Sequence, residues 1–382
     1  MVMISKIVFA SAFLLAISTT YAQNKDLQTG TGKGKIISSS YWVADKVQEI
    51  RGLKHGPFVT LPNNNILTVD GNEIYRSTDE GKSWLPYSEI ADTNKFLISA
   101  GAMIRTSKNI IILSFVNLKE KANWNWQKDI HDSPGSLLPS YAVRSIDGGK
   151  TWEIPQKLHN EWTGANRDMI ETSDGSIVLT SMIMRHHPGH HTVLTYTSKD
   201  EGKSWIASNI IDLGGIGNHS GVMESTLVQL RDGRLWMLLR TNWGDFWQTF
   251  SDNDGLTWKE TGPTNIDASS SPGIIKRLKS GNLVLVWNRL FQEGRKEYPL
   301  RGGDGNLSEV PANWQRDELS IMFSSDDGKS WSKPVVFAKV TRKGEQLSYP
   351  YVFEVKPGKL WITTSFRGDL GINLYEKDFI GR

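Results

Sequence analysis

The chain has 382 residues, with 44 basic and 41 acidic side chains and a formal net charge of +3. So small a charge on a protein of this size argues against a nucleic-acid partner bound by phosphate neutralisation. The absence of cysteine excludes disulfides, a thiol nucleophile and a lipidated cysteine, so packing alone must stabilise the fold. The 15 tryptophans and 35 glycines, with few segments of helical period, predict an all-β protein.

The N-terminus has the features of an export signal. Lys6 gives a positive start, residues 7–17 form an apolar run, and Thr20-Tyr21-Ala22 supplies small residues at the cleavage positions. We predict a signal peptide over residues 1–22, cleaved after Ala22, rather than an uncleaved anchor. No later stretch approaches the ~18 apolar residues of a membrane helix. The sequence thus predicts a secreted or periplasmic protein whose residues 23–382 form a single domain.

An eight-residue pattern, Ser-x-Asp-x-Gly-x-x-Trp (an Asp box), recurs along the chain. It covers residues 77–84, 145–152, 198–205 and 324–331, and a variant at 251–258 has Asn253 in place of Asp. The pattern is typical of a tight turn between two strands, in which the Asp side chain accepts backbone N–H groups and Gly takes a conformation that a Cβ would hinder. Five copies indicate a repeat protein.

A weaker repeat, a hairpin turn followed by alternating apolar residues, occurs six times. The turns lie at residues 64–66, 108–110, 175–177, 233–235, 281–283 and 358–360, and an Asp box follows each of the first five. We therefore predict a six-bladed β-propeller with four-stranded blades and Asp-box turns. Strands from both chain ends usually close such a ring, so we expect residues 36–43 to join the last blade. The long segments 117–139 and 292–311 are expected to be loops over the functional face.

Repeat-equivalent positions on the innermost strands point to a site on the propeller axis. Nine residues before each hairpin turn stand His55, Ser99, Asn166, Glu224, Pro272 and Tyr349. Equivalent positions of a purely structural repeat should look alike, whereas these hold a histidine, an amide, a carboxylate and a phenol. Their divergence indicates a ligand or catalytic site.

Three segments resemble the sialidase superfamily. Residues 223–241 look like the sialidase stretch that carries a buried glutamate and an arginine for the substrate carboxylate. Residues 314–319 are similar to the stretch around the third arginine of that family's triad, and residues 347–350 to the one that holds its tyrosine nucleophile. Together with the repeated Asp boxes, the resemblance in fold extends over essentially residues 23–382.

The resemblance implies a retaining glycosidase in which Tyr349 attacks the anomeric carbon and Glu224 takes its proton, while Arg240 and Arg316 clamp an acidic group of the sugar. A neutral phenol can approach an anomeric centre that carries a carboxylate, where an acidic nucleophile would be repelled. Paired arginines offer planar, bidentate donors to that carboxylate. The structural alternative is that Tyr349 is a hydrogen-bonded buried phenol and that the arginines brace neighbouring blades.

Two departures from the family pattern concern the acid and the clamp. His55-Gly56-Pro57 stands where sialidases have Arg-Ile-Pro, so His55 replaces the first arginine of the triad. The loop expected to hold the acid/base aspartate is short, with Asp70 as its candidate. His55, Asp168 and His219 are other candidate proton donors, because a histidine near neutrality or a carboxylic acid can serve.

Further candidates for substrate contact are Arg167 and Arg289, on the third and fifth blades. The histidines at 186, 187, 190 and 191 could bind a metal, but their spacing fits no known metal pattern and Pro188 with Gly189 marks a turn. We therefore expect a polar rim loop there, no metal site and no cofactor. Trp124, Trp126 and Trp243 are either platforms for sugar stacking or packing residues.

These features predict an exo-acting glycoside hydrolase that removes a terminal, acidic, sialic-acid-like sugar. A glycosidase for a non-sialic sugar, a polysaccharide lyase for uronate-containing glycans and a non-catalytic glycan-binding propeller are the alternatives. We expect a carbohydrate as the partner, no nucleic acid and a monomeric protein.

Overall fold

A computed structural model describes residues 33–38, 41–366 and 368–380. The predicted signal peptide, residues 1–22, lies outside these. Strands make up almost all of the regular structure, and the helices in the described part are the short 3-10 turns η2 (Leu118–Glu120) and η3 (Glu376–Asp378). None of those residues forms a helix long and apolar enough to cross a membrane.

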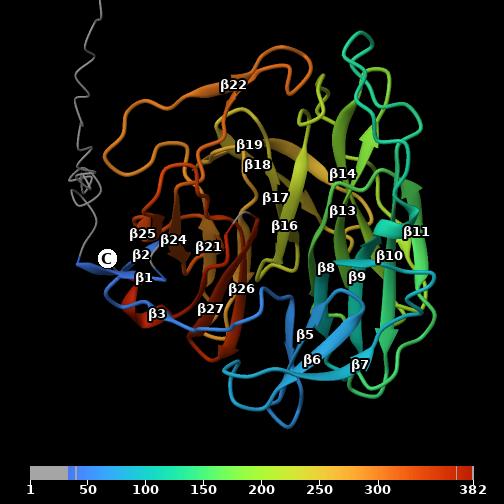
Figure 1. Ribbon diagram of the computed structural model, residues 1–382, viewed down its shortest axis with the longest axis vertical. Helices are drawn as coiled ribbons and strands as arrows, with labels where there is room; N and C mark the ends of the chain where they lie inside the picture. The colour runs from blue at the N-terminus through green and yellow to red at the C-terminus, as the bar shows by residue number, and fades with distance from the viewer. Residues whose placement is uncertain (1–32, 39–40, 367, 381–382) are drawn as a thin grey trace, which may run out of the picture.

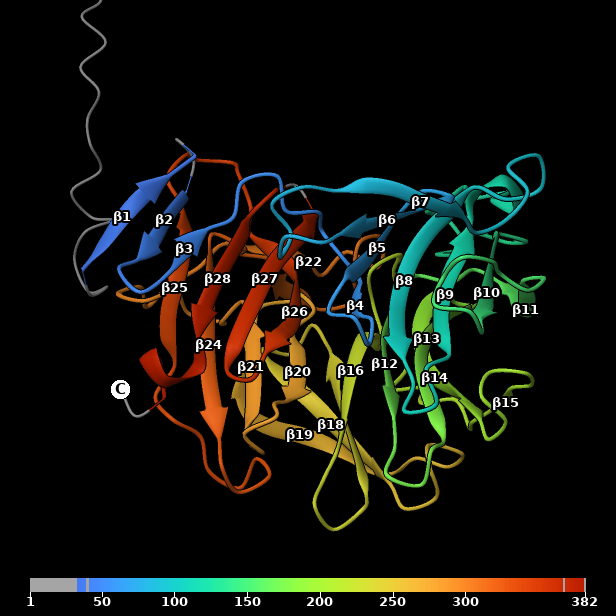
Figure 2. The ribbon, with the colours of Figure 1, turned by 90° about the horizontal axis from the view of Figure 1, so that it is seen from below.

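The strands form six blades around a central axis, which confirms the predicted six-bladed β-propeller (Figures 1 and 2). Blade 1 has β4 (Phe58–Thr60), β5 (Ile66–Asp70), β6 (Glu73–Ser77) and β7 (Leu85–Glu89). Blade 2 has β8 (Ile98–Arg105), β9 (Ile111–Asn117), β10 (Leu137–Ser145) and β11 (Gln156–Glu161). Blade 3 has β12 (Asn166–Glu171), β13 (Ile177–Arg185), β14 (His190–Ser198) and β15 (Ile206–Ala207).

The remaining blades follow the same antiparallel order. Blade 4 has β16 (Met223–Gln229), β17 (Leu235–Arg240), β18 (Asp245–Ser251) and β19 (Lys259–Asp267). Blade 5 has β20 (Ile274–Arg277), β21 (Leu283–Trp287), β24 (Glu318–Ser324) and β25 (Val335–Val340). Blade 6 has β26 (Ser348–Lys356), β27 (Lys359–Phe366) and β28 (Gly371–Tyr375), with a fourth strand from the other end of the chain.

Ring closure differs from the prediction. The closing strand of blade 6 is β3 (Gln48–Glu49), which pairs with β28. The segment expected to do this forms β1 (Gly34–Ile37) and β2 (Tyr41–Ala44), and β2 pairs with β25 of blade 5. The prediction for residues 36–43 was therefore wrong. β2 extends the sheet of blade 5 beyond β25, and the apolar side chains of both strands belong to one core.

The apolar cores lie between neighbouring blades. One cluster joins blades 1 and 2 through Leu67, Leu113 and Phe115, all fully buried. Blades 4 and 5 share another, in which Leu285 and Trp287 pack with blade 4 side chains. Burial of apolar surface between adjacent sheets is the main favourable contribution in such repeats.

All five Asp boxes form the predicted turn. In the first, the Ser77 hydroxyl accepts a hydrogen bond from the Gly81 N–H (2.8 Å) and donates one to Asp79 (2.8 Å). Oδ1 of Asp79 accepts the N–H of Ser83 (2.9 Å). The same set recurs in the other boxes, and Asn253 accepts equivalently in the variant.

The box glycine also sets the spacing between blades. At each of the five positions φ lies between 77° and 82°, a region that favours glycine. A Cβ there would lie within 2.9 Å of a side chain of the preceding blade. The glycine and its neighbour are Gly81 with Trp361, Gly149 with Leu67, Gly202 with Ile112, Gly255 with Val178, and Gly328 with Trp236.

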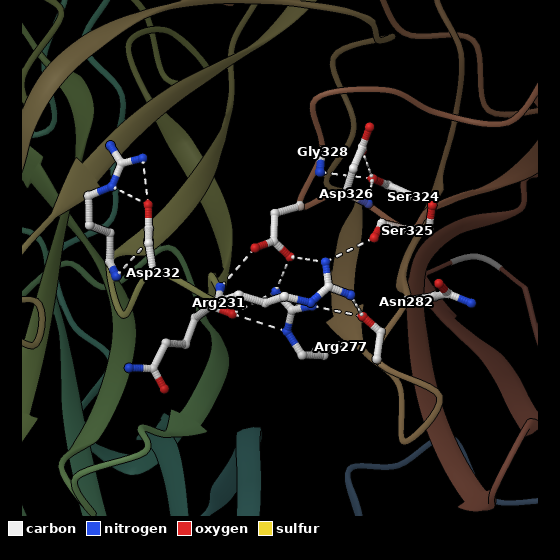
Figure 3. Close-up of polar contacts among 12 residues, drawn as sticks. Arg231, Asp232, Arg277, Asn282, Ser324, Ser325, Asp326 and Gly328 are labelled. Atoms are coloured by element: carbon white, nitrogen blue, oxygen red, sulfur yellow. Dashed lines mark hydrogen bonds and ion pairs between the residues drawn. The ribbon is translucent and has the colours of Figure 1, made fainter.

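Charged side chains add a second link between blades on the Asp-box face, shown for blades 4 and 5 in Figure 3. Arg231, in the hairpin of blade 4, donates to the carbonyls of Ser325 (2.9 Å) and Gly281 (2.8 Å), and its N–H donates to Asp327 (2.8 Å). Arg277 donates to the other oxygen of Asp327 (2.7 Å). The fifth Asp box is thereby fixed to two hairpins.

The opposite face carries the long loops. Because the blades are antiparallel, the starts of the inner strands lie on the same face as the connections from the second strand to the third. Residues 118–136 of blade 2 and 288–317 of blade 5 are such connections. The latter contains the two-stranded ribbon of β22 (Leu300–Gly302) and β23 (Pro311–Asn313), drawn in orange in Figure 1.

Candidate active site

Tyr349 and Glu224 meet on this loop-bearing face. Tyr349 lies at the start of β26 and Glu224 at the start of β16, so blades 6 and 4 bring them together across the axis. The Tyr349 hydroxyl donates a hydrogen bond of 2.7 Å to Oε1 of Glu224. A phenol joined to a carboxylate in this way can pass its proton to the carboxylate as the phenol oxygen attacks an electrophile.

Arg240, at the end of β17, lies behind this pair. Its Nη1 donates to Oε2 of Glu224 (2.7 Å) and lies 3.4 Å from the Tyr349 oxygen. Its Nε and Nη2 donate to the Ser270 hydroxyl, which in turn donates to Asn242. Burial raises the pKa of Glu224, but the charge of Arg240 and the bond from Tyr349 outweigh it and lower that pKa to about 2. Glu224 is therefore an ionised proton acceptor.

Tyr349 is surrounded by cations. The guanidinium carbons of Arg167 and Arg316 lie 5.3 Å and 5.5 Å from the centre of its ring. Burial first, and the negative charge of Glu224 second, raise the pKa of Tyr349, while Arg240 and Arg316 oppose the rise. The phenol is thus protonated at rest and needs Glu224 to take its proton.

The backbone of Tyr349 has φ of 56°, in the left-handed region that a bulky residue rarely adopts. Holding it there costs about 1–2 kcal/mol. The following residue, Pro350, accepts a hydrogen bond of 2.6 Å from Nη2 of Arg167 through its carbonyl. This contact helps to hold a conformation that aims the phenol at Glu224.

A cavity of about 330 Å³ opens beside Tyr349. Two arginines, Arg301 and Arg316, line it, and Trp314 and Phe366 give it apolar walls. Arg316 is 5 % exposed and donates to the Ser270 carbonyl (3.0 Å), and its charge is near the rings of Trp314 and Phe366. Burial, and then the charge of Arg240, lower the pKa of Arg316 to about 10, so it keeps its charge at neutral pH. A cavity of this kind suits a ligand with a ring and an anionic group.

The structure brings together six of the residues singled out from the sequence: Tyr349, Glu224, Arg240, Arg316, Arg167 and His219. Arg240 does not itself line the cavity, because Glu224 and Ser270 occupy its guanidinium. His219 lines the mouth, with its ring centre 5.1 Å from that of Trp314.

Four other predicted residues lie apart from this cavity. His55 is exposed, and its carbonyl accepts a hydrogen bond from Thr363. Asp70, at the end of β5, forms an ion pair with Lys54 (2.7 Å). Neither residue lines the cavity.

Asp168 and Arg289 have structural partners. Asp168 is 2 % exposed, pairs with Lys276 and accepts hydrogen bonds from the Thr226 hydroxyl (2.6 Å) and the Leu227 N–H (3.1 Å), so it joins blades 3, 4 and 5. Arg289 lies 3.5 Å from Asp267. Among the equivalent inner positions, only Glu224 and Tyr349 are hydrogen bonded to each other, while Asn166 bonds within the junction of blades 2 and 3.

The histidine cluster on the rim is held by acidic residues and carbonyls. Nδ1 of His186 lies 2.7 Å from buried Asp132, and Nε2 of His190 lies 3.0 Å from Asp212. His191 contacts the Asn218 carbonyl (2.9 Å) through Nε2. Over the described residues, no group of three His, Cys, Asp or Glu side chains is placed to hold a metal ion. The cluster thus connects loops on this face.

Two of the three predicted aromatic platforms pack against other tryptophans. Trp124 stacks on Trp162 with ring centres 4.1 Å apart, and Trp243 lies 4.9 Å from Trp247. Trp314, which does line the cavity, was part of a family-like segment but was not singled out.

Ser270 and Arg301 were not predicted from the sequence. Ser270 lies two residues before Pro272, the position chosen by counting from the hairpin, and the run 269–271 of three serines was the available signal. Arg301 lies on β22, within the long connection of blade 5, where no repeat marks its position.

Comparisons with known proteins agree with this fold. The family model of the BNR repeat-like domain matches residues 69–362. A search of curated proteins gave no match. A protein of unknown function from Dyadobacter fermentans superposes with a TM-score of 0.60 at 15% identity, over 87% of this chain and 99% of that one.

Two further solved structures carry names. The Hadza microbial sialidase Hz136 superposes with a TM-score of 0.57 at 16% identity, over 89% of this chain and 66% of that one. The α-L-arabinanase of Penicillium chrysogenum, complexed with arabinobiose, gives 0.52 at 10% identity, over 88% of this chain and 99% of that one. At these identities the likeness concerns the fold alone. The chain belongs to the BNR repeat-like domain family and has the six-bladed propeller of the sialidase superfamily.

Proposed function

We propose that this protein is a glycoside hydrolase that removes a terminal sugar with Tyr349 as nucleophile. The hydrogen bond of 2.7 Å between Tyr349 and ionised Glu224, beside a cavity, carries the proposal. A purely structural phenol has no need of a strained backbone and a buried carboxylate next to a cavity. The similarity in fold to a sialidase and to an arabinanase supports carbohydrate as the substrate.

In the first step the Tyr349 oxygen forms a bond to the anomeric carbon and its proton passes to Glu224, while the bond to the leaving oxygen breaks. We assign the protonation of that oxygen to His219, which lines the cavity. Water then cleaves the sugar from Tyr349. In this step His219 takes a proton from the water, and Glu224 returns its proton to the tyrosine oxygen. The nearby guanidinium groups stabilise the phenolate character that develops on the tyrosine oxygen.

Arg316 supports an acidic, sialic-acid-like sugar as the substrate, because its buried charge faces the cavity beside the nucleophile. The replacement of the first triad arginine by exposed His55 removes one expected contact, so the sugar can differ from ordinary sialic acid. In this proposal the enzyme acts outside the cytoplasm, in line with the signal peptide predicted for residues 1–22.

The test is hydrolysis of 4-methylumbelliferyl glycosides of sialic acid, its deaminated analogue, uronic acids and rhamnose. We expect one acidic glycoside to be cleaved by the wild type and not by Tyr349→Phe. Tyr351→Phe, which removes a hydroxyl that accepts the Phe58 N–H (3.3 Å), is the matched control and should keep activity. Equal activity of Tyr349→Phe and wild type would reject the nucleophile, and an unsaturated product from uronate polymers would indicate a lyase instead.

A further inference from the structure

The β22–β23 ribbon is a defined structure over the cavity rather than a loose loop. Its strands pair Arg301 with Ala312. At the tip, Oδ1 of Asp304 accepts the N–H groups of Asn306 and Leu307, both at 3.0 Å. These backbone bonds lower the pKa of Asp304, so the turn is held by an ionised carboxylate. The ribbon can therefore present a side chain at a fixed place.

The ribbon is fixed to the connection between blades 3 and 4. The N–H groups of Asn218 and His219 donate to the carbonyls of Asn306 and Leu307, both at 2.9 Å. Gly217, with φ of 139°, approaches so closely that a Cβ would lie 2.7 Å from the Leu307 oxygen. The position of His219 at the cavity mouth thus depends on the ribbon.

Arg301 is the charge that the ribbon brings to the cavity. It is exposed, whereas Arg316 is 5 % exposed and next to Tyr349, so the two mark the outer and inner ends of one cavity. No Asp or Glu belongs to the described lining, and no ion pair described for the chain includes Arg301. Arg295, in the same loop, instead lies 3.9 Å from Asp317. An unpaired arginine in such a position attracts an anion.

We propose that the β22–β23 ribbon forms an outer subsite in which Arg301 binds an anionic group, a carboxylate or sulfate, on the leaving part of the glycan. The inference rests on the proposed function, because a terminal sugar at Tyr349 leaves the rest of the glycan at the mouth. Pro299, from the start of the ribbon, and Trp314 supply apolar surface for the face of that second sugar. The preferred substrates are therefore glycans with an anionic group on each side of the cleaved bond.

The test uses two glycosides of the sugar identified above, one of neutral 4-methylumbelliferone and one of anionic 7-hydroxycoumarin-4-acetic acid. We expect the wild type to have the higher kcat/KM for the anionic aglycone, and added salt to reduce the preference. Arg301→Gln should lower this preference, the ratio of the two kcat/KM values, by about 2- to 5-fold, the range of an exposed charge pair. Arg301→Lys should keep part of it.

Lys296→Gln removes another exposed charge from the same loop, outside the cavity lining, and should keep the preference. An unchanged preference in Arg301→Gln, or none in the wild type, would overturn the subsite. If neither glycoside is cleaved, the proposed function fails by itself. In that case calorimetry gives the dissociation constants of the two glycosides for wild type and Arg301→Gln. The subsite is supported if wild type binds the anionic glycoside more tightly than the neutral one and Arg301→Gln reduces this difference.

Discussion

Arg167 and Pro350 stand on inner strands of different blades, and a hydrogen bond of 2.6 Å joins the guanidinium of the first to the carbonyl of the second. The bond holds the carbonyl of the residue that follows Tyr349, and Tyr349 itself has a φ of 56° that must be held against strain. Arg167 is therefore a positioning residue. We expect Arg167→Met to lower kcat on the 4-methylumbelliferyl substrate about 10- to 100-fold with little change in KM.

Arg167→Lys keeps a donor and a charge and should recover part of kcat. Because Arg167 also lies over the Tyr349 ring, thermal unfolding of each variant separates lost stability from lost positioning. A rise in KM with unchanged kcat would show that Arg167 contacts the substrate instead.

Removing the charge of Glu224 should affect both chemistry and folding. Glu224→Gln cannot take the proton of Tyr349, so kcat should fall about 10²- to 10⁴-fold. It also leaves the buried Arg240 charge without its partner, which costs about 3–5 kcal/mol in the free energy of unfolding. Denaturant titration and steady-state kinetics measure the two effects.

Glu318→Gln is the matched control, since Glu318 is 3 % exposed and paired with Lys339 (3.2 Å) outside the cavity lining. It should lose comparable stability and keep kcat. If kcat fell in proportion to the lost stability in both variants, Glu224 would have no specific role in catalysis.

The pH dependence of hydrolysis tests His219 as the proton donor. Desolvation of its ring first, and the charge of Arg240 second, lower the pKa of His219 to about 4, so its acid form declines above that pH. Glu224, with a pKa of about 2, must stay ionised. We expect a natural glycan to be cleaved best at acid pH, with the rate falling about tenfold per unit above pH 4.

A 4-methylumbelliferyl glycoside needs little help for its leaving group and should have a flatter profile above pH 4. His219→Asn should remove the difference between the two profiles. A natural glycan cleaved fastest at neutral pH would assign the acid to another group.

His159 should make stability depend on pH. Its two ring nitrogens contact the hydroxyls of Tyr196 and Thr163, and burial lowers its pKa to about 4. The unfolded chain has the ordinary value of about 6.5, so between these values the unfolded state binds more protons and stability falls as the pH is lowered. The loss should reach about 3 kcal/mol at pH 4.

Denaturant unfolding from pH 7 to pH 4 measures this loss for the wild type and for His159→Gln, which should lose less. His187→Gln removes an exposed histidine and should behave as the wild type. If the free energy of unfolding changed with pH equally in all three proteins, the loss could not be assigned to His159.

Two neighbouring glycines of the second Asp box separate backbone strain from contact between blades. Gly148 and Gly149 have φ of 76° and 82°, but a Cβ on Gly148 has open space, whereas one on Gly149 would lie 2.8 Å from buried Leu67. We expect Gly148→Ala to cost about 1 kcal/mol. Gly149→Ala should cost about 1–3 kcal/mol more, because it overpacks the junction. Equal melting temperatures would show that the blades do not need this close approach.

Much of the fold could be predicted because its repeats can be recognised in the sequence. Five Asp boxes and six hairpins give the number and order of the blades, since each local turn has a required residue type. Closure could not be predicted in the same way. β2 and β3 are short, carry no box, and are placed by the apolar edge of β25 and the open edge of β28.

The site could be predicted in part. Glu224 and Tyr349 were found because equivalent inner positions differ, and the structure joins them by a hydrogen bond. Asp168, two residues beyond the equivalent position Asn166, was a candidate proton donor, but it pairs with Lys276 and accepts a hydrogen bond from Thr226. Arg301 carries no repeat signal, because a ribbon folded by its own turn brings it to the cavity. Chain position alone does not reveal such contacts.

The contact of Gly81 with Trp361 joins the first blade to the last. During synthesis blade 1 leaves the ribosome long before Trp361 has been made. The side of blade 1 that packs against blade 6 therefore stays without a partner until the chain is complete. The other box glycines meet a neighbour that precedes them, and these junctions can form as the chain grows. Final assembly therefore waits for the sixth blade, and a nascent chain shortened at its end would expose the flank of blade 1 to aggregation.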